Sequence, residues 1–140
     1  MPYATQAKLI ERYGEDALLV IADRDNDGII DADVVTQALD DATAEIDAYL
    51  AAKYSLPLPS VPDVLVRLCS DISMYRLAAE ADQATDERRL RYEDAISLLR
   101  SISKGTASLG LEVPPPSSNG GVTLVSQPRR FNRSGMRKLT

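Results

Sequence analysis

The chain has 140 residues, of which 44% are hydrophobic and 5% aromatic, so one domain with an aliphatic core is expected. It contains no histidine and one cysteine, which excludes Ser-His and Cys-His catalysis, histidine-bound metals, an internal disulfide and a structural zinc site. Residues 1–126 carry all 21 acidic and 11 basic side chains, whereas residues 127–140 carry five basic side chains and no acid. The missing catalytic residue types predict a protein that is not an enzyme. The charge distribution predicts an acidic partner for the basic tail: nucleic acid, another protein or the body of another copy.

Five helices are predicted over the first 105 residues, because apolar side chains recur there every three or four positions. The first begins after the N-cap Thr5 and ends at Gly14, which is expected to be a left-handed C-cap. The second spans residues 15–22. The third begins after Asp31, which is expected to cap it, and its pattern continues to Lys53.

The fourth helix is predicted to begin at about Pro62, and the fifth to run from the N-cap Thr85 to Lys104 before Gly105. The apolar stripe of the fourth helix is expected to consist of Leu65, Leu68, Ile72, Tyr75 and Ala79. Between the third and fourth helices, residues 54–62 contain three prolines and are expected to pack as an extended elbow. The elements predict an all-α fold, a small helical bundle with three long and two short helices.

Two further expectations concern side chains on these helices. Cys69 lies beside the apolar stripe of the fourth helix, so it is predicted to be a buried and unreactive thiol. Arg88, Arg89 and Arg91 alternate with acidic residues on the fifth helix and are expected to form a charged surface suited to subunit contacts. No apolar run approaches the roughly 20 residues of a membrane-spanning helix, and the N-terminus lacks the apolar core of a signal peptide. We therefore expect an intracellular protein without a membrane partner.

Residues 106–140 are predicted to form an extended, basic C-terminal arm, separate from a helical domain at residues 1–105. The arm is rich in proline, glycine and serine, and it has too little apolar surface to order itself, so it must dock onto a partner. Residues 122–125 resemble a strand that can add to a neighbouring protein. The residues predicted to bind a partner are Val122, Leu124, Arg129, Arg130, Phe131, Arg133, Arg137 and Lys138.

The segment between the second and third helices follows the pattern of a calcium-binding EF-hand loop. Asp23, Asp25, Asp27 and Asp31 occupy positions 1, 3, 5 and 9 of such a loop, and a glycine occupies position 6. Position 12, where a bidentate glutamate closes the coordination sphere, is Val34. The four aspartates are therefore candidate ligands of a weak calcium site, and no cofactor is expected to be required. The alternative is a turn in which the aspartates cap the third helix.

Six segments of the chain keep the order in which they occur in a known family. They are Tyr3–Gly14, Asp23–Gly28, Glu45–Leu50, Tyr54–Pro59, Arg91–Ala95 and Arg130–Arg133. Together they resemble the small head–tail connector, or neck adaptor, protein of Mu-like phages and prophages. The resemblance covers nearly the whole chain, although no single segment carries it alone.

This resemblance implies a structural virion protein that forms a homo-oligomeric ring, usually of twelve copies, below the portal. The ring is expected to contact the portal protein and the next neck or tail-completion protein. It extends the channel through which DNA passes without sequence-specific binding, and it helps head completion and tail attachment. The implied location is the head–tail neck of the virion, after assembly in the cytoplasm of the host bacterium.

Two other functions remain open at this point. The first is a small calcium-responsive binding module, built around the aspartate-rich loop at residues 23–31. The second is a nucleic-acid-binding protein that uses the basic C-terminal tail; it predicts salt-sensitive DNA binding that is lost when the chain is truncated after Gln127.

Overall fold

The computed structural model describes residues 2–114, and within them the chain forms five helices and no strand. The helices are α1 (Gln6–Tyr13), α2 (Glu15–Ala22), α3 (Ala32–Leu50), α4 (Asp63–Glu80) and α5 (Asp86–Lys104). This arrangement confirms the predicted all-α fold. The largest difference is the end of α3, which lies at Leu50, three residues before the predicted Lys53.

The helix ends follow local hydrogen-bonding signals at most of the predicted positions. The Thr5 hydroxyl accepts a hydrogen bond from the backbone N–H of Lys8 at 3.3 Å, and the Thr85 hydroxyl accepts one from Arg88 at 3.2 Å. Gly105 ends α5 in the left-handed conformation, with φ of 84° and ψ of 5°. Gly14 differs from its prediction, because its ψ of 151° lies outside the left-handed helical region although its φ is 91°.

The predicted capping role of Asp31 is wrong at the side-chain level. Its carboxylate makes no hydrogen bond to the first turn of α3, and instead accepts one from the backbone N–H of Arg24 at 2.7 Å. The bond joins the two ends of the aspartate-rich loop, seven residues apart. The Asp31 side chain therefore joins the ends of the loop and does not cap α3.

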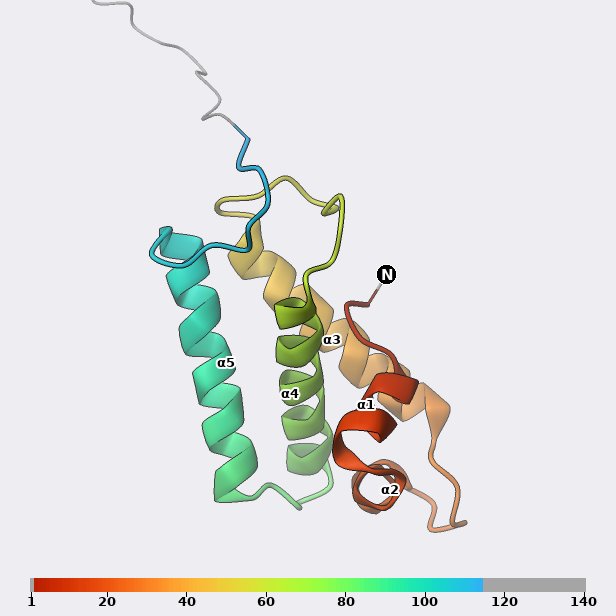
Figure 1. The fold of residues 1–140 in the computed structure, drawn as a ribbon. Coiled ribbons are helices and arrows are strands. Elements are labelled where there is room, and N and C mark those ends of the chain that lie inside the picture. Colours follow the sequence, from red (N-terminus) through yellow and green to blue (C-terminus); the bar gives the residue numbers. More distant parts are fainter. Residues whose placement is uncertain (1, 115–140) are drawn as a thin grey trace, which may run out of the picture.

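The three long helices pack against one another, and the pair α1–α2 covers one side of α4 and α3 (Figure 1). The core is aliphatic, as the composition predicts, and its largest fully buried side chains include Leu9, Leu18, Ile21, Ile46, Leu50, Leu65, Leu68, Ile72, Leu77, Leu99 and Ile102. None of the helices within residues 2–114 has the length and apolar character needed to cross a bilayer.

The buried side of α4 is broader than the predicted stripe. Tyr75 is only half-buried and Ala79 is exposed, whereas Met74, Leu77 and Ala78 are buried. The reason is that α4 lies at the centre of the fold and contacts all four other helices, so more than one of its faces is covered. Cys69 is buried, as predicted, and burial raises the pKa of its thiol.

The chain after α5 returns across the elbow that joins α3 to α4. The hydroxyl of the buried Tyr54 accepts a hydrogen bond from the backbone N–H of Leu109 at 3.0 Å, and Leu109 and Leu111 pack against the core. Within the elbow Leu58 is half-buried, whereas Leu56 is 37% exposed. Residues 106–114 thus lie on the end of the bundle that carries the elbow between α3 and α4 (Figure 1).

Candidate functional site

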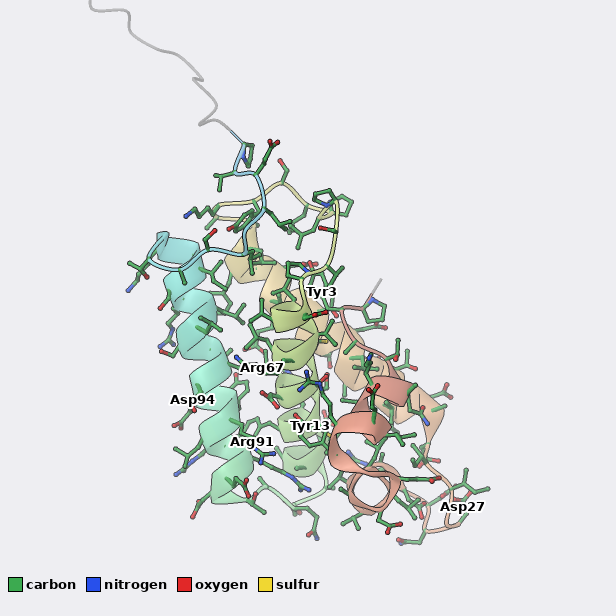
Figure 2. The ribbon with its side chains drawn as sticks, in the orientation of Figure 1. Tyr3, Tyr13, Asp27, Arg67, Arg91 and Asp94 are labelled. Atoms are coloured by element: carbon green, nitrogen blue, oxygen red, sulfur yellow. The ribbon has the colours of Figure 1, made fainter. Side chains whose placement is uncertain are left out.

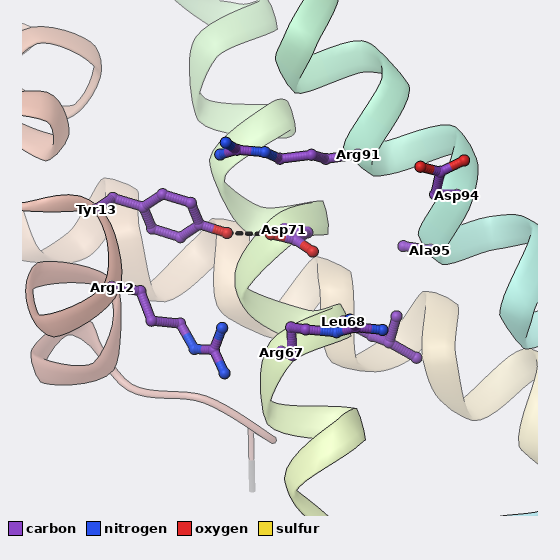
Figure 3. Close-up of a pocket in the computed structure, with 8 residues that line it drawn as sticks. All are labelled: Arg12, Tyr13, Arg67, Leu68, Asp71, Arg91, Asp94 and Ala95. Carbon is purple, nitrogen blue, oxygen red and sulfur yellow. Dashed lines mark hydrogen bonds between the residues drawn. The ribbon is translucent and has the colours of Figure 1, made fainter.

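An open pocket of 390 Å³ lies where α1, α4 and α5 meet (Figures 2 and 3). Its lining consists of Arg12, Tyr13, Arg67, Leu68, Asp71, Arg91, Asp94 and Ala95, and we call it the arginine pocket. Three arginines from three different helices therefore face one hollow in a body that is otherwise acidic. A polar and open lining of this kind suits a charged group better than an apolar small molecule.

A tyrosine–aspartate pair occupies the middle of the arginine pocket. The Tyr13 hydroxyl donates a hydrogen bond to the Asp71 carboxylate, with Arg91 on one side of the pair and Arg12 and Arg67 on the other (Figure 3). Burial and the bond to Asp71 raise the pKa of Tyr13, while the charges of Arg91 and Arg12 oppose the rise. Tyr13 therefore stays protonated and holds Asp71 in place.

The three arginines differ in how they are engaged. Arg91 donates a hydrogen bond to Glu87 one turn earlier on α5. Within residues 2–114, neither Arg12 nor Arg67 forms a side-chain hydrogen bond or an ion pair, and both are exposed. Their guanidinium groups are available to an external anion, and a planar guanidinium binds a carboxylate through two parallel hydrogen bonds.

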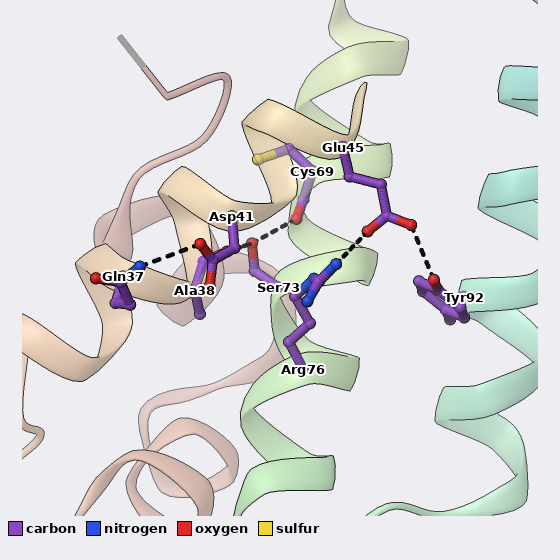
Figure 4. A network of polar contacts seen from close by, with 8 residues as sticks. All are labelled: Gln37, Ala38, Asp41, Glu45, Cys69, Ser73, Arg76 and Tyr92. Carbon is purple, nitrogen blue, oxygen red and sulfur yellow. Dashed lines mark hydrogen bonds and ion pairs between the residues drawn. The ribbon is translucent and has the colours of Figure 1, made fainter. Parts of the chain in front are cut away.

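A second polar cluster connects the three long helices (Figure 4). Glu45 of α3 accepts a hydrogen bond from Arg76 of α4 at 2.6 Å and another from the Tyr92 hydroxyl of α5 at 2.9 Å. Tyr92 also stacks on Tyr75, with ring centroids 4.5 Å apart. Burial and the bond to Glu45 raise the pKa of Tyr92 to about 12. The Nε atom of Arg76 is buried and has no hydrogen-bond partner within residues 2–114. The bonds through Glu45 join the three long helices at one point.

The aspartate-rich loop brings three of its four candidate ligands together. One carboxylate oxygen each from Asp23, Asp25 and Asp27 lies within 4.8 Å of the others, which is compatible with one shared cation. Asp31 does not belong to this group, because its carboxylate binds the backbone N–H of Arg24. Val34, half-buried at position 12, supplies no oxygen ligand. The loop thus offers three carboxylates where a complete EF-hand site offers six to eight oxygen ligands.

Hydrogen bonds to backbone N–H groups hold the aspartate-rich loop in shape. Asp23 accepts from Asp27 at 3.2 Å and from Gly28 at 2.9 Å, and Asp27 accepts from Ile29 at 2.8 Å. Desolvation raises the pKa of Asp23, but its hydrogen bonds with Gly28, Asp25 and Asp27 together outweigh this effect and place the pKa below its ordinary value. The pKa of Asp25 is raised, chiefly by its side-chain hydrogen bond with Asp23. The two aspartates therefore interact directly, with opposite effects on their pKa values.

A groove of 330 Å³ lies between the elbow and the last described residues. Its lining is formed by Tyr54, Ser55, Pro57, Leu58, Pro59, Leu111, Glu112, Val113 and Pro114. Most of these side chains are apolar. The predicted partner-binding residues lie outside the described residues: Val122, Leu124, Arg129, Arg130, Phe131, Arg133, Arg137 and Lys138.

The arginine pocket is the feature that sequence reasoning missed. Arg12, Arg67 and Arg91 are far apart in the chain, and each lies among acidic residues that make it resemble an ordinary solvated charge. Only the packing of α1 and α5 against α4 brings them to one hollow. The available signal was indirect, because Tyr13 and Arg91 belong to segments that carry the family resemblance.

Comparison with known proteins gives a consistent result. The family described as “Bacteriophage Mu, Gp36” matches residues 3–125. The “Mu-like prophage FluMu protein gp36” of Haemophilus influenzae (strain ATCC 51907 / DSM 11121 / KW20 / Rd) is 43% identical over 109 residues, which cover 78% of this chain and 76% of the relative. “Gene product J” of Escherichia phage Mu is 36% identical over 137 residues, which cover 95% of this chain and 96% of the relative.

Proposed function

The chain belongs to the bacteriophage Mu Gp36 family, which makes it a Mu-type phage protein, and we propose that it is a structural protein of the virion neck. In this proposal it is a head–tail connector that forms a homo-oligomeric ring of twelve copies. The ring lies below the portal, extends the DNA channel and presents a surface to the next neck protein. It carries no catalytic activity.

The observation that carries this proposal is the separation of charge between the helical body and the end of the chain. The described body holds all 21 acidic residues and 11 basic ones, whereas the last 14 residues hold five basic side chains and no acid. A ring needs head-to-tail contacts between two different surfaces of each copy. A basic segment and an acidic body form such a complementary pair, and opposite charges favour the correct encounter.

The acidic body also suits a channel through which DNA slides. A basic lining would bind the phosphate backbone tightly, because each neutralised phosphate releases counterions and increases the affinity. A net-negative body does not retain the DNA in this way. The same consideration disfavours a general nucleic-acid-binding role for the body.

Removal of the basic end of the chain tests this proposal. A variant truncated after Gln127 lacks Arg129, Arg130, Arg133, Arg137 and Lys138 but retains the whole described body. We expect it to keep the helicity and melting temperature of the full chain and to lose assembly into a ring on the portal protein of the same phage. Co-sedimentation with the portal measures the loss, and circular dichroism measures the fold.

A full-length variant with the same five basic residues replaced by glutamine separates charge from chain length. If it assembles into a ring on the portal as well as the unmodified chain, the charge-based contact is wrong. If the truncated and glutamine variants lose salt-sensitive binding to DNA while portal binding is unchanged, the nucleic-acid-binding alternative replaces the connector.

A further inference from the structure

The arginine pocket has a positive lining on a body with a large negative charge. Its lining combines three arginines with two aspartates, and one of these aspartates already accepts a hydrogen bond from Tyr13. Residues 2–114 as a whole contain ten more acidic than basic side chains. Copies with this charge repel one another when they lie side by side, so a contact between them requires a local positive surface.

The opposite charge is concentrated on one helix. The 19 residues of α3 include five acidic side chains, Asp33, Asp40, Asp41, Glu45 and Asp47, and no basic one. Glu45 and Asp47 are engaged within the fold by Arg76 and Tyr3, and Asp41 accepts a hydrogen bond from Gln37. Asp33 and Asp40 are exposed and have no side-chain partner within residues 2–114. They are seven residues apart and thus lie two turns apart on one face of the helix.

The arginine pocket and the exposed face of α3 lie on different sides of the subunit, so one copy can contact a different neighbour through each. The view into the arginine pocket shows α4 in front and α3 passing behind it (Figure 3). The pocket opens between α1, α4 and α5, on the side of α4 away from α3. A positive surface and a negative surface on different sides of one subunit form the two halves of a head-to-tail interface, which closes into a ring when the rotation allows.

We propose that the arginine pocket binds carboxylates of a second copy of this chain, supplied by the exposed face of α3 at Asp33 and Asp40. This inference rests on the proposed connector function and adds a contact between bodies to the contact made by the basic C-terminal segment. Arg12 and Arg67 are the primary contacts, because neither has a side-chain partner within residues 2–114.

The experiment compares full-length variants for assembly on the portal protein of the same phage, followed by native mass spectrometry. The first variant combines Arg12→Gln with Arg67→Gln, and the second combines Asp33→Asn with Asp40→Asn. The matched control combines Arg100→Gln with Lys104→Gln, which removes the same charge from exposed positions of α5 outside the pocket. Circular dichroism verifies that each variant has the helicity of the unmodified chain.

We expect both pocket and α3 variants to bind the portal as single copies and to need at least tenfold more protein to fill the ring. The control should need no more than twice the unmodified amount. Reversed charges on both surfaces, Arg12→Glu and Arg67→Glu together with Asp33→Lys and Asp40→Lys, should restore ring formation. A double variant at Arg12 and Arg67 that fills the ring normally overturns the inference and leaves the connector function intact.

The remaining outcomes are also decisive. Loss of single-copy portal binding in the arginine variant means that the pocket contacts the portal, and it overturns the assignment to a second copy. Reduced DNA binding with unchanged ring filling assigns the pocket to a phosphate and also overturns it. An unmodified chain that never binds the portal contradicts the connector function itself, and the inference falls with it.

Discussion

At the scale of single residues, three tyrosine hydroxyls donate hydrogen bonds to carboxylates. Tyr3 binds Asp47, Tyr13 binds Asp71 and Tyr92 binds Glu45. Each bond joins residues at least 40 positions apart, so the pairs connect the N-terminal segment and α5 to the rest of the bundle. Burial raises the pKa of all three tyrosines, and the neighbouring carboxylate raises it further.

These raised pKa values predict a loss of stability at alkaline pH. In the unfolded chain the tyrosines ionise near pH 10, whereas in the folded protein Tyr92 ionises at about 12 and Tyr3 and Tyr13 ionise higher still. The stabilisation is therefore complete below pH 10 and is lost as the pH rises toward the folded pKa values. Urea unfolding between pH 8 and 11.5 should show a falling free energy of unfolding.

Tyr92→Phe is the control for this prediction, because it removes one of the three raised groups. The variant should lose less stability between pH 9 and 11.5 than the unmodified chain. If the free energy of unfolding of the unmodified chain stays constant over this interval, the pKa values of the three tyrosines are not raised in the folded protein.

The aspartate-rich loop gives a second prediction at this scale. Its backbone hydrogen bonds form between the loop's own residues, and position 12 carries Val34 instead of a ligand. We therefore expect removal of divalent cations with a chelator to leave helicity and melting temperature unchanged. A rise in melting temperature in millimolar calcium that Asp25→Asn abolishes would instead support the calcium-responsive alternative.

At the scale of helices, the cluster of Glu45, Arg76 and Tyr92 joins α3, α4 and α5 at one point. Glu45→Gln removes the charge that both partners bind, and it removes the ion-pair partner of the half-buried Arg76 guanidinium. We expect a loss of about 1–3 kcal/mol in the free energy of unfolding, as for other buried polar groups that lose a partner. Urea unfolding at pH 7 measures this loss.

Glu93→Gln is the matched control, since Glu93 pairs with Arg89 on the exposed surface of α5 at 3.8 Å. An exposed pair four residues apart on a helix contributes about 0.5 kcal/mol or less. If Glu45→Gln costs no more than Glu93→Gln, the cluster does not fasten the helices.

The helices were predictable because their signals are local. Thr5, Thr85 and Gly105 act within one turn of the helix end they mark, and the apolar period is contained in each segment. The predicted cap by Asp31 was wrong because two local hydrogen bonds compete for its side chain. A carboxylate that can cap a helix can equally bind the other end of its loop. Tyr75 and Ala79 were misplaced because a single stripe does not describe a helix covered on several sides.

The candidate site was far less predictable. Tyr13 and Asp71 are 58 positions apart, and Arg12 and Arg67 are separated by a similar length of chain. Their meeting depends on how α1 packs against α4, which no local pattern in the sequence encodes. The carboxylates of the aspartate-rich loop could be placed together from the sequence because they lie within five residues of one another.

At the scale of the whole molecule, charge is separated both along the chain and across the fold. The body is acidic and the last 14 residues are basic, while within the body α3 is acidic and the arginine pocket is positive. In the proposed connector, these two pairs of complementary surfaces form the contacts between neighbouring copies. The composition accounts for the first separation, and only the packing of the helices accounts for the second.

Imaging of the full chain mixed with the portal protein of the same phage tests the connector function most directly. Particle averages from electron microscopy should show a ring of copies of this chain below the portal, coaxial with its channel. Portal particles without added density, together with a chain that remains monomeric in the same mixture, would contradict the connector function.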